Sequence, residues 1–154
     1  MTDSPAPGVR TRLGLLAGLL LALAGCAETG VPAGGATLTD IYWVLVEVDG
    51  DTFSNYQGTR EPNIVFRREG GRVTGFSGCN NMAGGYETSG DALRVGPLAL
   101  TRMACLGADA TAMESAFVRA LDQTTAYRIN GAVLELRDAA GTTRVRLEAH
   151  GPAR

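Results

Sequence analysis

The side chains of this sequence with the most reactive chemistry are its three cysteines, Cys26, Cys79 and Cys105. A thiol can be acylated, can pair in a disulfide, or can bind a soft metal ion as its thiolate. The single histidine, His150, lies among the last few residues, where fraying makes a general base or a metal ligand a poor fit. This argues against Ser-His-Asp, Cys-His and multi-histidine zinc chemistry and leaves the cysteines as the starting point.

Cys26 ends a segment with the layout of a secretory leader. Two arginines, Arg10 and Arg12, precede an uncharged apolar run over residues 13–25, which is shorter than the ~20 residues needed to span a bilayer. The run closes on Leu-Ala-Gly-Cys, which resembles the lipobox of bacterial lipoproteins. That resemblance implies diacylglycerol on the Cys26 sulfur, cleavage between Gly25 and Cys26, and acylation of the new amine. The alternative is an ordinary signal peptide with a chance cysteine.

The expected organisation is a signal peptide over residues 1–25, a lipidated flexible tether over 26–38 and a folded domain over 39–149. The residue after the cysteine is Ala27, whereas lipoproteins that stay in the inner membrane of two-membrane bacteria usually carry aspartate there. We therefore expect a lipid anchor in the outer membrane, with the domain facing the periplasm. The net charge of -2 and the absence of any basic run exclude nucleic acid as a partner.

Export would leave Cys79 and Cys105 as an even pair in an oxidising compartment, which predicts one disulfide between them. Closing a loop of this length contributes roughly 3 kcal/mol by the chain-entropy estimate. The sequence has no Cys-x-x-Cys motif of the redox-active kind.

A metal site is the alternative for the same pair. Met82 lies three residues after Cys79, and Met103 lies two residues before Cys105. Two thiolates with two thioethers would suit Cu(I), which is a soft ion. We prefer a disulfide beside methionines that fill gaps in the core, because oxidation of the two thiols would destroy the metal site. We therefore expect no cofactor.

Other polar groups have structural explanations. Glu47, Asp49 and Asp51 surround Gly50 without the spacing of a calcium loop, so we interpret Asp49-Gly50 as a turn between strands. We expect the remaining candidates to act within the fold: Asn80 and Asn81 by closing turns, Arg102 by an ion pair or hydrogen bonds to loop carbonyls, and Trp43 as part of the core.

Alternating apolar and polar residues, separated by turn residues, predict strands over most of the domain. A hairpin is expected from residues 63–68 and 72–76, and a second joins 86–87 to 92–95 around Ser89-Gly90-Asp91. A third joins residues 125–129 and 132–137 through a type I′ turn at Asn130-Gly131. Further strands cover residues 41–48 and the region around 145–147. The Gly-rich stretch from Gly75 to Gly85 predicts no strand beyond Phe76.

A single helix is expected over about residues 111–122. Thr111 and Glu114 form a capping box, and behind them Met113, Phe117 and Leu121 recur every four residues. Such an apolar stripe must be buried against a sheet. The fold class is therefore α+β: a mostly antiparallel sheet, strongly curved or sandwich-like, with one packed helix.

Two short motifs resemble those of the META/HslJ domain family. They are Gly78-Cys79-Asn80 and the segment Thr101-Arg102-Met103-Ala104-Cys105, in this order and followed by the predicted helix. The resemblance covers nearly all of the chain after the tether. It implies an antiparallel sheet with one helix, often in secreted lipoproteins, some of them heat-inducible envelope proteins. The family has no agreed catalytic residues to carry over.

The expected function is that of a monomeric, non-enzymatic envelope lipoprotein, a tethered binding or stress-related module whose partner is another envelope protein. One alternative is a protease-inhibitor-like or small-ligand binder that works through an exposed loop at Gly78 to Gly85. A hydrolase using Asp or Glu is the other alternative, and the sequence shows no cluster of titratable residues that would favour it.

Overall fold

The computed structural model describes residues 1–2, 36–52, 60–105 and 108–153. The predicted cleavage and acylation site at Gly25 and Cys26 therefore lies outside the described residues, as do most of the leader and the tether. Within the described part of the chain, no helix is long and apolar enough to cross a membrane.

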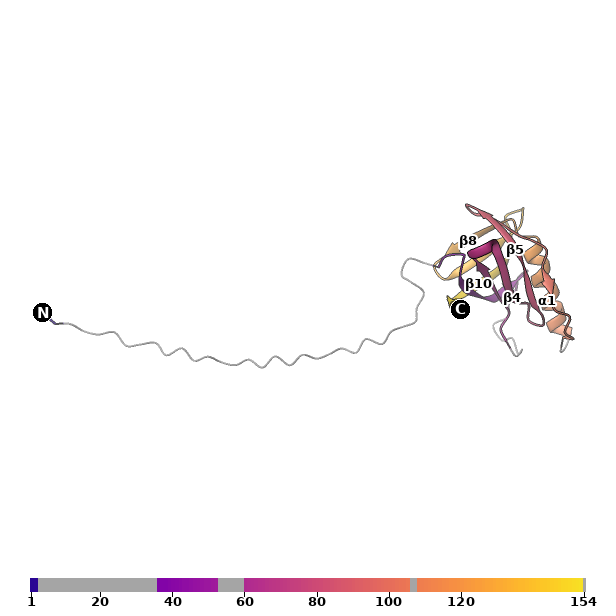
Figure 1. The fold of residues 1–154 in the computed structure, drawn as a ribbon, viewed down its shortest axis with the longest axis horizontal. Helices are drawn as coiled ribbons and strands as arrows, with labels where there is room; N and C mark the ends of the chain where they lie inside the picture. Colours follow the sequence, from indigo (N-terminus) through magenta and orange to yellow (C-terminus); the bar gives the residue numbers. More distant parts are fainter. Residues whose placement is uncertain (3–35, 53–59, 106–107, 154) are drawn as a thin grey trace.

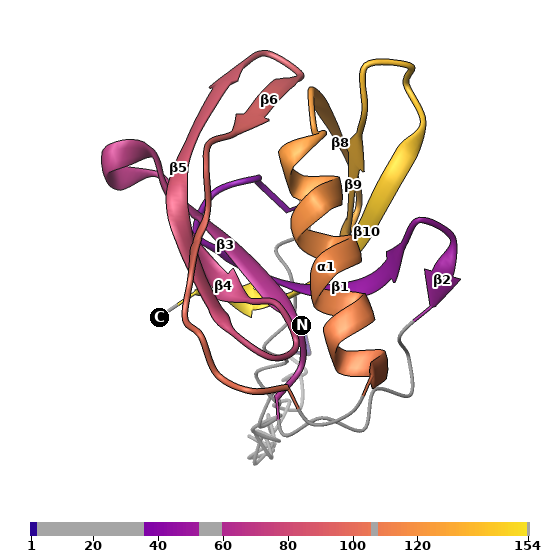
Figure 2. The same ribbon diagram turned by 90° about the vertical axis from the view of Figure 1, so that its right-hand side faces the viewer.

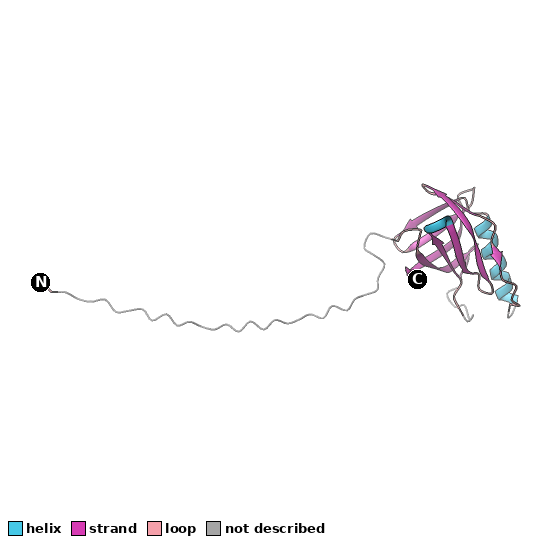
Figure 3. Cartoon of the chain, in the orientation of Figure 1, coloured by secondary structure: helices cyan, strands magenta, loops and turns pink. Residues whose placement is uncertain are grey.

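The fold is one antiparallel sheet of ten strands that curves into a ring, with one helix packed on it (Figures 1 and 3). Its long path runs β10-β9-β8-β6-β5-β4-β3-β1-β2, and the additional pairing of β10 with β1 closes the ring. This confirms the α+β class with a strongly curved sheet. The strands are β1 (Ile41–Val48), β2 (Asp51–Thr52), β3 (Asn63–Arg67), β4 (Arg72–Phe76), β5 (Asn81–Ser89), β6 (Ala92–Val95), β7 (Ala99–Leu100), β8 (Ala126–Asn130), β9 (Val133–Arg137) and β10 (Thr143–Pro152).

The three predicted hairpins are present, but one turn differs from the prediction. Asn130 pairs with Val133, so the two central residues of the β8–β9 turn are Gly131 and Ala132. Gly131 has a φ of +60°, and Asn130 is not in the left-handed region. A type I′ turn at Asn130-Gly131 is therefore wrong. The glycine instead occupies the first central position of the turn. A two-residue hairpin turn of type II′ has glycine there at positive φ, and the residue after it has negative φ.

The Gly-rich stretch is also more ordered than its composition suggests. Residues 77–80 form a tight turn, and β5 starts directly after it at Asn81. Gly84 and Gly85 lie within β5, opposite Val73 and Arg72 of β4. Pairing with the backbone of β4 holds these glycines in a strand. Their composition alone predicts a loop, because that pairing cannot be seen in the local sequence.

The interior of the ring is apolar, and α1 (Ala108–Asp122) packs over it between the β5–β6 hairpin and the strands β8 to β10 (Figure 2). Trp43, Phe66 and Phe117 are completely buried, so the expectation that Trp43 belongs to the core is confirmed. Met113, Phe117 and Leu121 point inward from α1 as the four-residue period predicts. Burial of each such side chain contributes about 1.5–3 kcal/mol relative to exposure.

The folded chain extends beyond both predicted ends. Leu38, at the end of the predicted tether, is 6% exposed and belongs to the core, and its carbonyl accepts a hydrogen bond from the Trp43 indole. At the other end β10 continues to Pro152, so His150 lies in a strand paired with β1 and not in a frayed terminus. Pairing to β1, which is distant in sequence, holds this last segment in place.

The carboxylates around Gly50 are structural. Asp49 and Gly50 both have positive φ, as the predicted turn requires, and Asp49 accepts a hydrogen bond of 2.6 Å from Arg144. Arg144 also pairs with Asp138. The backbone N–H of Thr142 is the main cause that holds the pKa of Asp138 below its usual value. Glu47 pairs with Arg146, and Asp51 is exposed at the start of β2, so these acids do not form an acid–base cluster.

Candidate functional site: a braced groove beside the helix

The two motifs meet at a buried turn between β4 and β5. The Asn80 carbonyl accepts a hydrogen bond from the Ser77 backbone N–H at 2.8 Å, which closes the turn. Gly78 has a φ of +100°, and a Cβ there would also collide with the Met113 side chain of α1. The backbone conformation therefore favours glycine at this position, and any other residue would also have to displace the end of the Met113 side chain.

A disulfide joins Cys79 of this turn to Cys105, 26 residues later, with a Cα–Cα distance of 5.3 Å. This is the pairing that the sequence analysis predicts. It connects the β4–β5 turn to the end of the second motif, just before α1. This bond consumes the two thiol sulfurs of the alternative Cu(I) site. Met82 is 2% exposed within the core, as a gap-filling residue would be, whereas Met103 is 53% exposed.

The Asn80 side chain connects three segments of the chain. Its Oδ1 accepts hydrogen bonds from the Thr101 hydroxyl and from the Met103 backbone N–H, each at 2.8 Å. Its Nδ2 donates to Glu114 Oε1 of α1 at 3.0 Å. Asn80 is 4% exposed, so these bonds are shielded from water. One amide thereby fixes the Thr101–Met103 segment and the helix to the β4–β5 turn.

Glu114 has a different role from the predicted one. The helix begins at Ala108, three residues before Thr111, so Thr111 lies inside α1 and the capping box is wrong. The Glu114 carboxylate accepts from the Asn80 backbone N–H at 3.0 Å and contacts the Ser77 hydroxyl. The sequence contains the pattern of a capping box, but the β4–β5 turn supplies better donors for this carboxylate than its own helix terminus.

This network has the groups of a nucleophile and a base without the access that catalysis needs. Ser77 is completely buried, and its hydroxyl also lies 2.9 Å from the Asn80 carbonyl. Cys79, Cys105 and Glu114 offer ligand atoms within 4.8 Å of one another, but the two sulfurs are joined as a disulfide. The arrangement is a brace that holds three chain segments together.

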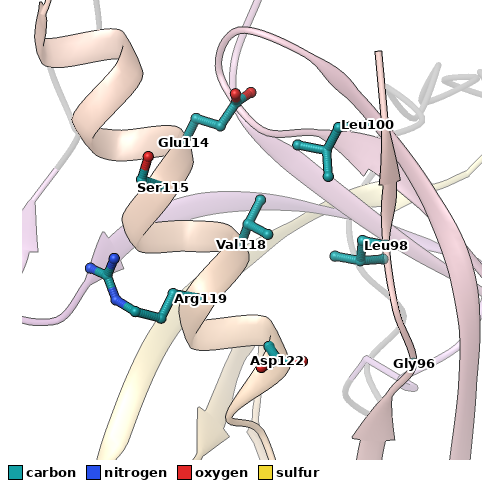
Figure 4. Close-up of a pocket in the computed structure, with 8 residues that line it drawn as sticks. All are labelled: Gly96, Leu98, Leu100, Glu114, Ser115, Val118, Arg119 and Asp122. Carbon is teal, nitrogen blue, oxygen red and sulfur yellow. The ribbon is translucent and has the colours of Figure 1, made fainter. Parts of the chain in front are cut away.

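A groove of about 400 Å³ lies between α1 and residues 96–100, next to this brace (Figure 4). We call it the helix groove; its lining residues are Gly96, Leu98, Leu100, Glu114, Ser115, Val118, Arg119 and Asp122. Leu98 and Leu100 point toward the helix, and Val118 points from α1 toward them (Figure 4). The groove therefore has an apolar centre with charged residues along its helix side.

Comparison with known proteins identifies the fold. Residues 36–151 match the META domain. The chain belongs to the META domain family.

Solved structures share the fold of this META domain. An NMR structure of a protein from Burkholderia xenovorans is 25% identical, with a TM-score of 0.57, over 83% of this chain and 94% of that one. A second NMR structure is 22% identical, with a TM-score of 0.57, over 73% and 94%. A crystal structure of a DUF4847 family protein from Bacteroides vulgatus is 16% identical, with a TM-score of 0.51, over 76% and 96%. No curated protein matches the chain.

In this META domain the motif residues are distributed unequally. Gly78, Cys79, Asn80, Thr101 and Cys105 all belong to the brace. Arg102 is exposed and forms no ion pair or side-chain hydrogen bond with any described residue, so the expected structural ion pair is absent from this part of the chain.

One expected site is wrong, and one groove was not predicted from the sequence. The loop from Gly78 to Gly85 is not an exposed binding loop, because residues 77–80 are buried and the remainder is β5. The helix groove was missed, although Leu98 and Leu100 alternate with Ala99 in the sequence. Val118 lies beside the apolar stripe of the helix, and no neighbouring residue in the sequence indicates that it faces Leu98 and Leu100.

Proposed function

We propose that this META domain protein is a lipid-anchored, non-enzymatic binding module of the bacterial envelope and that the helix groove is its binding surface. The observation that carries the proposal is the apolar centre of a groove whose two walls are pinned together. Glu114 belongs to the groove and to the brace, so the disulfide and the Asn80 bonds fix the helix against the segment that follows β7. A preformed groove loses less conformational entropy when it binds a ligand than a flexible surface does, because its walls are already ordered.

The chemistry of the groove favours an extended polypeptide segment as the occupant. Leu98, Leu100 and Val118 offer apolar contacts to alternate side chains on one face of such a segment. Asp122 is exposed at one end of the groove and forms no ion pair with any described residue, so a basic residue next to the apolar ones would complement it. The partner we propose is accordingly a segment of another envelope protein with apolar residues followed by lysine or arginine.

The envelope location is supported by two independent features of the chain. The arginines, apolar run and cysteine at residues 10–26 have the layout of a lipoprotein leader. The disulfide between Cys79 and Cys105 is typical of proteins that fold in an oxidising compartment. Together they favour an acylated protein of the envelope, and Ala27 after the cysteine favours the periplasmic side of the outer membrane.

The groove is tested with a fluorescent peptide of alternating leucine and threonine that ends in lysine. Val118→Asp is expected to weaken binding about tenfold or more, because an unpaired carboxylate would be buried against apolar side chains. Ala99→Asp is the matched control, since Ala99 is exposed between Leu98 and Leu100 on the other face of β7. Equal affinity of the two variants would reject the groove. Mass spectrometry should recover the peptide uncut, and cleavage would reject a non-enzymatic role.

The anchor is tested by growing bacteria that express the chain with labelled palmitate. The wild-type protein is expected to carry the label and to fractionate with membranes, whereas Cys26→Ala should be unlabelled. Cys105→Ser serves as a control for thiol labelling elsewhere in the chain. An unlabelled wild-type protein, or a label that survives Cys26→Ala, would contradict lipid attachment at this cysteine.

A further inference from the structure

The outer face of the sheet has a depression that shares no residue with the helix groove. It has a volume of about 490 Å³ and lies over β1, β3, β4 and the end of β10. Side chains alternate between the two faces of a strand, so Val65 and Thr74, which are paired, point away from the core residues Phe66 and Val73. Val65 is only 5% exposed although it is not part of the inner core, and it provides an apolar floor for this depression.

Arg60 is held in position at the edge of the depression. Its Nη2 donates a hydrogen bond of 2.7 Å to Asn81 Oδ1. The guanidinium carbon lies 3.9 Å from the centre of the Phe76 ring, which supports the flat face of the group. Arg60 forms no ion pair with any described residue, and Asn81 is the one described residue that accepts a hydrogen bond from its guanidinium. A stacked and hydrogen-bonded guanidinium loses little further conformational freedom when it binds an oxyanion.

Three further side chains bring polar groups to the same place. The Tyr42 and Thr74 hydroxyls and the His150 imidazole line the depression and form no hydrogen bond with any described residue. Burial raises the pKa of Tyr42 above its ordinary value, an effect that the nearby Arg60 opposes and Glu61 reinforces, so this hydroxyl remains a donor at neutral pH. Arg67 also lines the depression, but its Nη1 already donates to the Ala153 carbonyl, and the proposed site does not require it.

Among the described residues that line the depression, the balance of charge is positive, because two arginines and no aspartate or glutamate are present. Glu61 is the carboxylate whose field reaches Tyr42, and it is exposed to solvent. A fixed guanidinium, hydroxyl donors and a histidine, without a lining carboxylate, match an oxyanion better than a cation or an apolar molecule.

We propose that this depression binds the phosphate group of an organic phosphate, with Arg60 as the main contact. Guanidinium groups bind phosphate oxygens in pairs of hydrogen bonds, and the hydroxyls of Tyr42 and Thr74 are placed to donate to the remaining oxygens. The volume lies in the range of small-molecule sites, which leaves room over Val65 for the organic part of the ligand.

Either of two sources would supply this chemistry: a soluble phosphomonoester or the head group of a phospholipid. The depression lies next to the point where the chain enters the domain, because the Asp40 carbonyl accepts a hydrogen bond from the backbone N–H of Ala153, which also lines the depression. A head group is thus within reach if the lipid anchor proposed above exists. The phosphate site itself does not depend on that anchor or on the helix groove.

The site is tested by NMR titration of the whole ¹⁵N-labelled chain with glycerol 3-phosphate. Saturable shifts are expected at Tyr42, Thr74 and Asn81, and Arg60→Gln should weaken the affinity about tenfold or more. Arg94→Gln, an equal change of charge at an exposed position of β6, is the matched control and should leave the affinity unchanged. The absence of saturable shifts, or an equal loss in both variants, would overturn the proposal.

A second arm distinguishes the two sources. The wild-type chain and Arg60→Gln are sedimented with vesicles of phosphatidylglycerol and, separately, of phosphatidylcholine, so that the leader contributes equally to both proteins. Stronger binding of wild type than of Arg60→Gln to phosphatidylglycerol, with the titration positive, supports the site and assigns a head group. Equal vesicle binding with a positive titration supports the site and assigns a soluble phosphate. Palmitate labelling reports on the anchor separately, so failure of either proposal can be recognised alone.

Discussion

Asn80→Ala is expected to lower the free energy of unfolding by about 3 kcal/mol, because the removed side chain is buried and three part-buried hydrogen bonds are lost with it. The Thr101 hydroxyl and the Met103 backbone N–H lose their acceptor, and Glu114 loses the donor that faces one of its carboxylate oxygens. The measurement is urea unfolding followed by the fluorescence of Trp43, which is completely buried.

Asn81→Ala is the matched control for this substitution. Asn81 is exposed, and its side chain accepts only the hydrogen bond from Arg60 among the described residues. We expect a loss of no more than about 1 kcal/mol, which is typical of an exposed hydrogen bond. Equal destabilisation by the two substitutions would show that the brace at Asn80 is not a main source of stability.

Asn80→Asp adds a pH dependence with a definite sign. The introduced carboxyl would be buried beside Glu114, so its folded-state pKa would be raised above its unfolded value. The folded state would then hold the proton more tightly than the unfolded state. The added destabilisation is therefore present above the raised folded-state pKa and is relieved as the pH falls through it. Stability that does not improve on mild acidification would argue against the contact with Glu114.

Removal of the disulfide is the second large effect. The double substitution of Cys79 and Cys105 by serine is expected to lower the free energy of unfolding by about 3.5 kcal/mol, since a bond spanning 26 residues restricts the unfolded chain. Serine keeps the size of the side chain close to that of cysteine. Urea unfolding of the wild type and the variant gives the difference directly.

Reduction of the wild type by a dithiol provides an independent measurement. It should shift the unfolding midpoint of the wild type toward that of the double variant and leave the variant itself unaffected. Hydrogen exchange should increase most in residues 101–105, which depend on both the disulfide and Asn80. A wild type that is insensitive to reduction would contradict a stabilising disulfide. A double variant that still binds the leucine–threonine peptide normally would show that the brace stabilises the domain without shaping the helix groove.

The motif residues and their partners include types that are common in reactive sites, but in this protein they form the brace and so act structurally. Cysteine, serine, glutamate and asparagine lie together, but their polar groups are directed at one another and at the backbone. A fully satisfied polar network in the interior rigidifies the segments that it joins. In this protein those segments are the β4–β5 turn, residues 101–105 after β7, and the helix. The helix forms one wall of the helix groove, and residues 96–100, which lead directly into the fixed segment, form the other.

Local sequence patterns determined much of this domain. Period-two alternation placed the hairpins, and the four-residue period of Met113, Phe117 and Leu121 identified the buried face of the helix. Counting the cysteines paired Cys79 with Cys105. These properties depend on neighbours within a few residues, or on a count that leaves one choice, so they can be read without knowledge of the tertiary structure.

Only the tertiary structure decided which distant groups meet. The ring closes where Trp43 pairs with Ala149, and no local pattern encodes a register between strands more than 100 residues apart in sequence. In the sequence, Glu114 fits the pattern of a capping box. In the structure it binds Asn80, because the folded sheet brings the β4–β5 turn within reach. The helix groove and the depression beside Arg60 arise in the same way: each is a surface made by segments whose contact is fixed by the packing of the whole ring.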